Sequence, residues 1–489
     1  MPHRPRPAVL LLCAFNLLAT TSGFQIGTAR ATTWTHATIL EDGRFNNAAT
    51  VRVAPDDAIH TAHKWQIDVN SNTRQIAHGT DASGSWIFES LTSVPSSKEY
   101  PHLDLGGGVH VVWRQHLGSG NWQLFYSNNT SGSFFAPRQL TFDAHVKGTA
   151  DIAVDSDEMV HIAYFTMDSG SADDEIYYMR YDAAADTAAV VQVTSDGQTD
   201  IAVALALAPD GTVHLAWIAG SISSGALRCA AGDLGGFLDI PTGVTSNAAQ
   251  PSLGVDGSGH PHVAYRRYEG SGLRSVQYIA HDGNGFGAPL PASPSDTFYS
   301  GVALALDGAG APHVSYYSNY DGHEGVYHAG WSGDAFATPD TLIALTDISY
   351  NETALHWGGS GLLAVVHNGA YVSNDTVRAN LYLHTVALPT TAIASHAAPR
   401  LTGVIRRLEN RPNPFNPATQ IVFELATAGD ASLEVVDVHG RRVARLLAGH
   451  RRAGTHQLDW HAGELPSGVY WLRLTLGGEV GTRRAVLLR

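Results

Sequence analysis

The chain has 489 residues, and its 50 glycines beside only 15% charged residues fit short strands and tight turns rather than long helices. The net charge of −15 argues against nucleic acid as a partner. Residues 400–489 hold thirteen Arg, no Lys and eight acidic residues, a balance of +5, which leaves −20 for the remainder. This asymmetry predicts two parts with different tasks.

The first residues have the pattern of a secretory signal peptide. His3, Arg4 and Arg6 give a basic start, and residues 8–19 form a short, mostly apolar run. Residues 29–31 then have the small-x-small form of a cleavage site, so we predict a signal peptide over residues 1–31. A retained membrane anchor is the alternative, although the run is short for a bilayer.

Cysteine is almost absent from the chain. Cys13 lies in the predicted signal and follows Leu12, which is too large for a lipoprotein cleavage site. Cys229 is then alone, so we expect no internal disulfide and stabilisation by packing only.

A histidine and an aromatic residue recur at intervals of 48 to 53 residues. The motif is His, two apolar or small residues, then Tyr or Trp, and it begins at His110, His161, His214, His262 and His313. An imperfect copy begins at His60 and a degenerate one at Ala364. A period of this length indicates one supersecondary unit repeated along the chain.

Each unit reads as four short strands separated by turn residues. In the unit around His262, we predict strands at residues 252–256, 262–266 and 275–280, with a fourth starting at 286–290. Four short strands per period are typical of one blade of a β-propeller.

The number of motif copies predicts seven blades, with six or eight as alternatives. The last unit supplies only three strands, and we expect residues 35–40 to add the missing outer strand and close the ring. The predicted fold is therefore all-β, with a propeller over residues 34–388. An open β-solenoid is a further alternative.

The repeated histidines could suggest a metal site, but each is expected on the second strand of a different blade. Ligands spread around a ring cannot converge on one ion. We therefore predict that each His bonds neighbouring backbone and that each Tyr or Trp packs between blades. The Asp-Gly turns are read as Asp-capped hairpins. Calcium at residues 155–158 is the alternative, and otherwise we expect no metal and no cofactor.

Candidate ligand-binding residues lie in loops that do not repeat and that share one face of the propeller. We select those that combine aromatic and polar side chains, as a sugar surface requires. The selected residues are Arg114, Trp122, His145, Arg266, Tyr268, Tyr299, Tyr320, His323 and Glu352. The loops that precede the first strands also contain Lys98, Glu99, Tyr100, Lys147 and Asp200.

The repeats resemble the sialidase-like or BNR-type propeller superfamily over about residues 35–390. The resemblance rests on the form Asp-x-x-Gly-x-x-His-Val-Ala-Tyr, as in residues 256–265. It implies a propeller fold and, in sialidases, three arginines that bind a carboxylate. The Asp-box Ser-x-Asp-x-Gly-x-x-Trp is not clearly present, and no catalytic residue can be assigned.

A second region begins after a linker at residues 389–401, which is rich in Ala, Thr and Pro. Alternating apolar runs predict strands at 421–425, 433–438, 443–447, 455–460, 469–476 and 482–488, with turns at 429–430, 439–440 and 477–478. These runs predict a small β-sandwich over residues 402–489.

The motifs of this region resemble a known sorting domain. Asn410-Arg411-Pro412-Asn413-Pro414-Phe415-Asn416-Pro417 opens it, and 465–474 reads Leu-Pro-Ser-Gly-Val-Tyr-Trp-Leu-Arg-Leu. The region resembles the C-terminal sorting domain of the type IX secretion system, similar to the Ig-like domain of the flagellar hook-capping protein. The resemblance implies passage across an outer membrane, with the secretion machinery as partner, and then release or surface attachment.

The sequence thus predicts an exported, monomeric cell-surface or secreted propeller. We expect a module that binds a polysaccharide or a surface protein, because no catalytic motif is present. A sialidase-like hydrolase or a polysaccharide lyase is one alternative, and a structural or adhesive surface protein is another.

Overall fold

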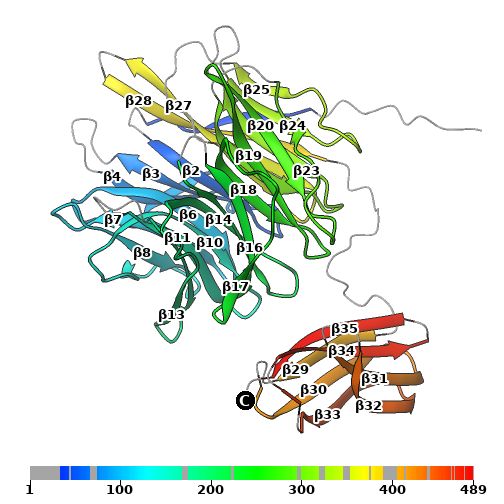
Figure 1. The fold of residues 1–489 in the computed structure, drawn as a ribbon. Coiled ribbons are helices and arrows are strands. Elements are labelled where there is room, and N and C mark those ends of the chain that lie inside the picture. Colours follow the sequence, from blue (N-terminus) through cyan, green and yellow to red (C-terminus); the bar gives the residue numbers. More distant parts are fainter. Residues whose placement is uncertain are drawn as a thin grey trace, which may run out of the picture. The chain divides into compact units, whose positions relative to one another are not determined.

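The computed structural model describes residues 33–42, 46–66, 74–167, 174–221, 225–294, 299–318, 325–344, 353–373, 376–388, 405–411, 415–437, 441–463, 465–466, 468–477 and 479–487. In these ranges every regular element is a β-strand, as predicted (Figure 1). No helix of the described ranges is long and apolar enough to cross a membrane. The predicted signal at 1–31 and linker at 389–401 lie outside the described ranges.

Up to Ala387, the described strands form seven antiparallel sheets of four strands each. The first three sheets are β2 (Asn46–Val53), β3 (Ile59–Gln66), β4 (Arg74–Thr80) and β5 (Ile87–Ser90); β6 (Lys98–Leu105), β7 (Val109–His116), β8 (Trp122–Asn128) and β9 (Arg138–Gln139); and β10 (Val146–Val154), β11 (Met159–Met167), β12 (Ile176–Asp182) and β13 (Thr187–Gln192).

The next four sheets follow the same plan, in the same strand order. They are β14 (Asp200–Leu207), β15 (Val213–Ala219), β16 (Ala226–Asp233) and β17 (Gly236–Asp239); β18 (Ala248–Val255), β19 (Pro261–Gly270), β20 (Leu273–Ala280) and β21 (Leu290–Pro291); β22 (Tyr299–Leu306), β23 (Pro312–Ser318), β24 (Gly325–Gly330) and β25 (Asp340–Ala344); and β26 (Thr353–Trp357), β27 (Leu362–Ser373), β28 (Thr376–Ala387) and β1 (Thr35–Leu40).

The first strand of each sheet lies against the first strand of the next. These contacts run from β2 through β6, β10, β14, β18 and β22 to β26, and β26 contacts β2 again. This is the arrangement of strands in a β-propeller, in which the first strands surround the axis.

The N-terminal strand closes the arrangement as predicted. β1 pairs antiparallel with β28, with Thr35 opposite Thr385 and Ala37 opposite Leu383. A hydrogen bond joins the Nδ1 atoms of His36 and His384 at 2.6 Å. The last sheet therefore contains strands from both ends of the repeat region.

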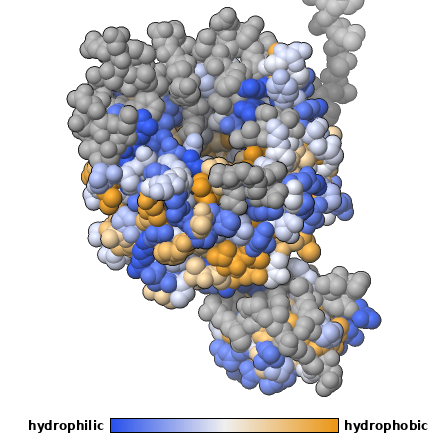
Figure 2. Space-filling view, turned by 60° about the vertical axis from the view of Figure 1, so that its left-hand side comes forward, coloured by the Kyte–Doolittle hydropathy of each residue, from blue (hydrophilic) through white to orange (hydrophobic). Residues whose placement is uncertain are grey.

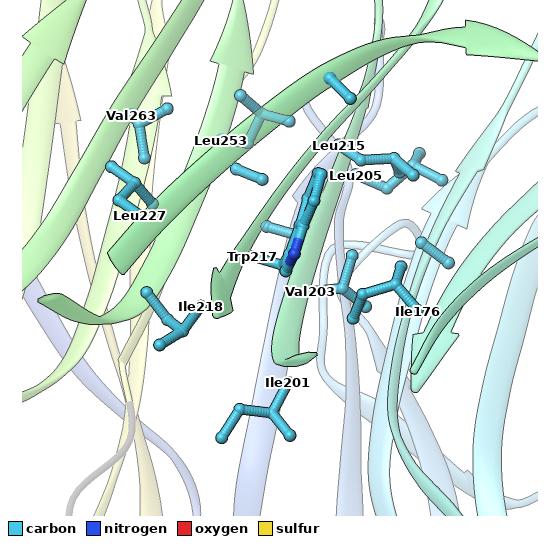
Figure 3. Close-up of a cluster of buried hydrophobic side chains, with 14 of the residues drawn as sticks. Ile176, Ile201, Val203, Leu205, Leu215, Trp217, Ile218, Leu227, Leu253 and Val263 are labelled. Atoms are coloured by element: carbon cyan, nitrogen blue, oxygen red, sulfur yellow. The ribbon is translucent and has the colours of Figure 1, made fainter. Parts of the chain in front are cut away.

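The aromatic residue of each motif packs between neighbouring sheets, as predicted. Trp217 is only 6% exposed and shares a hydrophobic cluster with Ile176 of the preceding sheet and with Leu253 and Val263 of the following sheet (Figure 3). Burial of such large side chains stabilises the contact between sheets at about 25 cal/mol per Å² of apolar area.

One strand prediction needs correction. The fourth strand of the fifth sheet is only Leu290–Pro291, whereas a strand starting at residue 286 was expected. Phe286 instead forms an isolated bridge with His281. Pro291 has no N–H to continue the ladder, so the strand ends there.

The C-terminal region forms two sheets around one hydrophobic core. Strands β29 (Ile405–Arg411), β30 (Ala418–Leu425) and β33 (Gly454–His461) form one sheet, and β32 (Arg442–Arg451), β31 (Gly429–Asp437), β34 (Gly468–Leu476) and β35 (Glu479–Leu487) form the other. Phe423, Leu433, Trp460 and Leu472 from the two sheets share the core.

Two details of this region differ from the prediction. The strand β29 was not expected, because its sequence Ile-Arg-Arg-Leu-Glu-Asn-Arg is mostly charged. Residues 429 and 430 were expected in a turn but begin β31, opposite Arg451 and His450. Pairing with a long neighbouring strand overrides the local turn preference of Gly and Asp.

Candidate functional site

The selected loop residues that the structure describes fall into two groups. Arg114 at the end of β7, Trp122 at the start of β8 and His145 before β10 are close together, because the side chain of Gln123 donates to the carbonyl of His145 at 3.1 Å. Arg266 and Tyr268 lie on β19, in a different sheet.

The side chains of the other selected residues are not described by the structure. Tyr299 begins β22 but only its backbone is described, and Tyr320, His323 and Glu352 lie outside the described ranges. The sequence set therefore yields one cluster, around Arg114.

The Arg114 guanidinium lies between two aromatic rings. Its central carbon is 4.8 Å from the ring centre of Tyr100 and 4.7 Å from that of Trp122. Arg114 Nη2 donates to Glu99 Oε2 at 2.6 Å, and Nη1 donates to the carbonyl of Lys147 at 3.3 Å. The ring of His116 lies 5.1 Å from that of Trp122. We call Glu99, Tyr100, Arg114, His116 and Trp122 the Arg114 cluster.

The backbone under the cluster is held in an unusual conformation. Tyr100 has a φ of +50°, and the register of β6 and β7 shifts between Glu99 and His102. Such bulges recur near the start of β2, β10, β14, β18 and β22. A positive φ costs a non-glycine residue about 1 kcal/mol or more, and it persists only where surrounding contacts enforce it.

Buried side chains fix the loops on both sides of the cluster. Lys98 is 1% exposed and donates to the carbonyls of Val94 at 2.6 Å and Ser96 at 2.8 Å. Lys147, also 1% exposed, forms an ion pair with Asp143. Burial lowers the pKa of Lys98 to about 8. These contacts hold the loops that carry Val94 and Phe142 in place.

The surface around the cluster is unusually apolar for loops. Phe142 is 77% exposed, Val94 57% and Leu117 45%. Figure 2 shows one face of the protein on which hydrophobic patches alternate with hydrophilic residues. Exposed aromatic and apolar groups beside Arg, Glu and His are suited to stack on sugar rings and to bond their hydroxyl groups.

A second polar group lies at the start of β14. Trp217 Nε1 donates to Asp200 Oδ1 at 2.9 Å, and Thr194 donates to Glu175 at 2.5 Å. Asp200 is 1% exposed, and burial raises its pKa to about 6. Because Asp200 is buried, we expect its charge to affect the stability of the fold and not the binding of a ligand.

The repeated histidines lie on the second strand of six sheets, as predicted, but for three of them the prediction of backbone partners was wrong. His110, His161 and His262 are hydrogen-bonded through Nδ1 to the hydroxyls of Tyr126, Tyr178 and Tyr278 at 2.6, 2.7 and 2.5 Å. These tyrosines are on the third strand, opposite the second residue after each His. The cross-strand neighbour is therefore nearer to the ring than a free backbone group.

The aspartates before these histidines cap the hairpin turns, as predicted. Asp155 Oδ1 accepts from the backbone N–H groups of Asp157 and Met159, each at 2.9 Å, and Oδ2 lies 3.1 Å from His161 Nε2. Asp256 and Asp307 accept equivalent bonds. Within the described ranges, no group of three or more His, Cys, Asp or Glu could hold a metal ion.

Sequence reasoning left several of these residues out of the selected set. Glu99 and Tyr100 were recognised as loop residues but not selected, and Phe142 and Leu117 were not noticed. A usable signal was that Phe142 and Leu117 interrupt polar loops without any copy in the other repeats.

Comparison with known proteins supports the fold. The chain matches none of the curated proteins. It is similar to a solved polysaccharide lyase, a PL25 ulvan lyase, with a TM-score of 0.51 and 11% identity over 71% of this chain and 95% of that one. A protein of unknown function from Dyadobacter fermentans has a TM-score of 0.46 and 10% identity, covering 72% of this chain and 98% of that one. These likenesses concern the fold alone.

The C-terminal region supplies the more specific match. Residues 411–487 match the family described as secretion system C-terminal sorting domain. This protein is therefore exported through type IX secretion to the cell surface or the medium. Along the chain, the β-propeller precedes the sorting domain.

Proposed function

We propose that the chain is a surface or secreted glycan-binding protein that uses the Arg114 cluster. The observation that carries this proposal is the Arg114 guanidinium held close to the rings of Tyr100 and Trp122. The exposed Phe142 belongs to the loop that Gln123, next to Trp122, binds through the carbonyl of Asp143. Rigid aromatic groups bind with little loss of conformational entropy, and Arg and Glu supply directed hydrogen bonds.

We further propose that the seven sheets form a closed seven-bladed propeller of the sialidase-like type, and that the sorting domain is Ig-like. The chain of contacts from β2 to β26 and back supports seven blades. The Asp-x-x-Gly-x-x-His-Val-Ala-Tyr motif supports the propeller type.

The test is binding of the full chain to a panel of surface polysaccharides, with two matched variants. Phe142→Ala removes a ring that is 77% exposed, and Leu238→Ala removes a side chain that is 79% exposed on β17. We expect Phe142→Ala to weaken binding about 3- to 10-fold, the range of one aromatic contact. Leu238→Ala should bind like the wild type.

Two results would contradict the proposal. Equal binding by the wild type, Phe142→Ala and Leu238→Ala would show that the glycan binds away from Phe142. Absence of binding to any polysaccharide would favour a structural or adhesive protein.

A second candidate function is β-elimination on a uronate polysaccharide. The observation in its favour is that Arg114 lies beside Tyr100 and Trp122, and that the ring of His116 lies 5.1 Å from that of Trp122. A guanidinium can neutralise a substrate carboxylate while a His removes the neighbouring C–H proton and a Tyr protonates the leaving oxygen. Absorbance of an unsaturated uronate product would support this activity, and a bound glycan without that product would reject it.

A further inference from the structure

Three arginines surround one carboxylate on the outer face of the sorting domain. Glu434 on β31 accepts from Arg442 Nη1 at 2.7 Å and Arg473 Nη2 at 2.8 Å, and its Oε1 lies 3.2 Å from Arg445 Nη2. The Glu434 side chain is 10% exposed, while the three arginine side chains are 53%, 43% and 54% exposed. The group therefore carries a net charge of +2 at the surface.

The geometry of this group is fixed by strand pairing. Glu434 lies opposite Arg445 on β32 and opposite Arg473 on β34. Hydrogen bonds from Arg473 and Arg442 hold the pKa of Glu434 at about 2, so the carboxylate stays charged and the guanidinium groups stay oriented. The remaining guanidinium N–H groups are thus pre-organised for an acidic partner.

An aromatic residue extends the same face. Along β34, Tyr470, Leu472 and Leu474 point into the core, so the alternating Trp471 and Arg473 lie on the outer side. Trp and Arg are the residues most enriched among the energetic centres of protein–protein interfaces. We call Glu434, Arg442, Arg445, Trp471 and Arg473 the arginine face.

The other sheet of the sorting domain has a different outer surface. Exposed positions on β30 and β33 include Gln420, Gln457 and Asp459, and Gln420 lies 3.4 Å from Asp459. The strands β30 and β33 carry no arginine, so no cationic cluster like the arginine face lies on them.

We propose that the arginine face is the surface by which the sorting domain docks on an acidic protein surface of the secretion machinery. The oriented guanidinium groups can each form two parallel hydrogen bonds with a carboxylate of the partner. Trp471 supplies an apolar contact beside them. A flat sheet face with both features suits a folded protein better than a flexible anionic glycan, which needs only diffuse positive charge.

The test uses the full chain in a bacterium with type IX secretion. Arg442→Gln with Arg445→Gln removes two charges and leaves Glu434 its bond to Arg473. The control, Arg451→Gln with Arg452→Gln, removes two charges at the far end of β32 and in the turn that follows it. We expect the exported fraction to fall about tenfold in the first pair and to stay unchanged in the control.

Folding and the competing partner are measured separately. Thermal unfolding of the purified proteins shows whether each double variant folds. If Arg442→Gln with Arg445→Gln does not fold, Arg473→Lys is used instead. This variant retains the positive charge but loses the planar guanidinium, and we expect the same fall in export. Equal export in both pairs, or an equal fall in both, would overturn the proposal. Normal export with lost binding to purified lipopolysaccharide would assign the face to an anionic glycan instead.

Discussion

At the residue scale, buried polar side chains lie at or next to the first position of several innermost strands. Asn46 donates to Asp42 at 3.0 Å, Lys98 donates to backbone carbonyls, and Lys147 pairs with Asp143. In the fourth sheet β14 begins with Asp200, which accepts a hydrogen bond from Trp217 Nε1. The starts of these strands therefore carry buried positive, neutral and negative groups.

Replacement of Asp200 by Asn should stabilise the protein at neutral pH. The folded-state pKa of about 6 lies above the ordinary value of 3.8, so stability is complete at low pH and is lost as the pH rises through 6. Asn retains an oxygen for Trp217 and carries no charge. We expect a gain of about 1–3 kcal/mol at pH 8 and a gain of roughly a third of that size at pH 4.5.

Thermal unfolding at the two pH values measures this effect. Asp334→Asn, in an exposed turn, is the control and should show no pH-dependent change. A lower melting temperature for Asp200→Asn at pH 8 would contradict the assignment of a destabilising buried charge.

At the element scale, a bond between the motif His and its cross-strand Tyr links the second and third strands in three sheets, and a His takes the place of the Tyr in two others. The same position on β16, opposite Ala216, is Cys229, and His214 Nδ1 has no hydrogen-bond partner among the described residues. The hydroxyl of Tyr265 is likewise buried without a described partner. Tyr265 therefore provides a control for the His–Tyr bond, because its buried hydroxyl takes no part in such a bond.

Tyr178→Phe should destabilise the protein, whereas Tyr265→Phe should not. Removal of the Tyr178 hydroxyl leaves His161 Nδ1 buried and unpaired, at a cost of about 1–2 kcal/mol. Removal of the Tyr265 hydroxyl takes away a buried polar group that has no partner, so we expect no loss or a small gain. Chemical denaturation of both variants measures the difference, and equal losses would contradict the role of the His–Tyr bond.

The sequence predicted the strands and their order because the motif repeats and its turn residues are local signals. It also predicted the closing role of residues 35–40, confirmed by the pairing with β28. The bulges could not be predicted, because the positive φ falls on Ala48, Tyr100, Ala202 and Gln250, residues with no preference for it. The Arg114 cluster depends on these bulges and on contacts between β6, β7 and β8, so only its members Arg114 and Trp122 were selected.

At the scale of the whole molecule, the propeller buries many neutral histidines. Burial lowers the pKa of eleven of them below 6.5, namely His60, His63, His78, His110, His161, His214, His262, His328, His356, His367 and His384. The values for His367 and His384 are about 4 and about 3. The unfolded chain therefore binds more protons than the folded protein below pH 6.5.

This imbalance predicts a protein that loses stability in mild acid. Each histidine with a lowered pKa contributes stability above pH 6.5 that is lost as the pH falls, with a slope of up to about 1.4 kcal/mol per pH unit. We expect the denaturation midpoint to fall steeply between pH 7 and pH 5. A midpoint that stays constant over this range would contradict the neutral, buried state of these histidines.

The lysines give a further prediction for the whole molecule. The chain contains three lysines, Lys64, Lys98 and Lys147, and they are 7%, 1% and 1% exposed. An amine-reactive ester should therefore leave all three unmodified in the folded protein and label them after denaturation. Mass spectrometry of the digested chain locates the label, and rapid modification of Lys98 without denaturant would contradict its burial.

The pairing of β1 with β28 also sets an order for assembly. His36 and His384, which bond across this pair, are 348 positions apart in the chain. The first strand emerges early from the ribosome and stays without its partner until nearly all of the repeats have been made. Contacts at such long separation form slowly, so we expect this pair to be among the last contacts of the propeller to form.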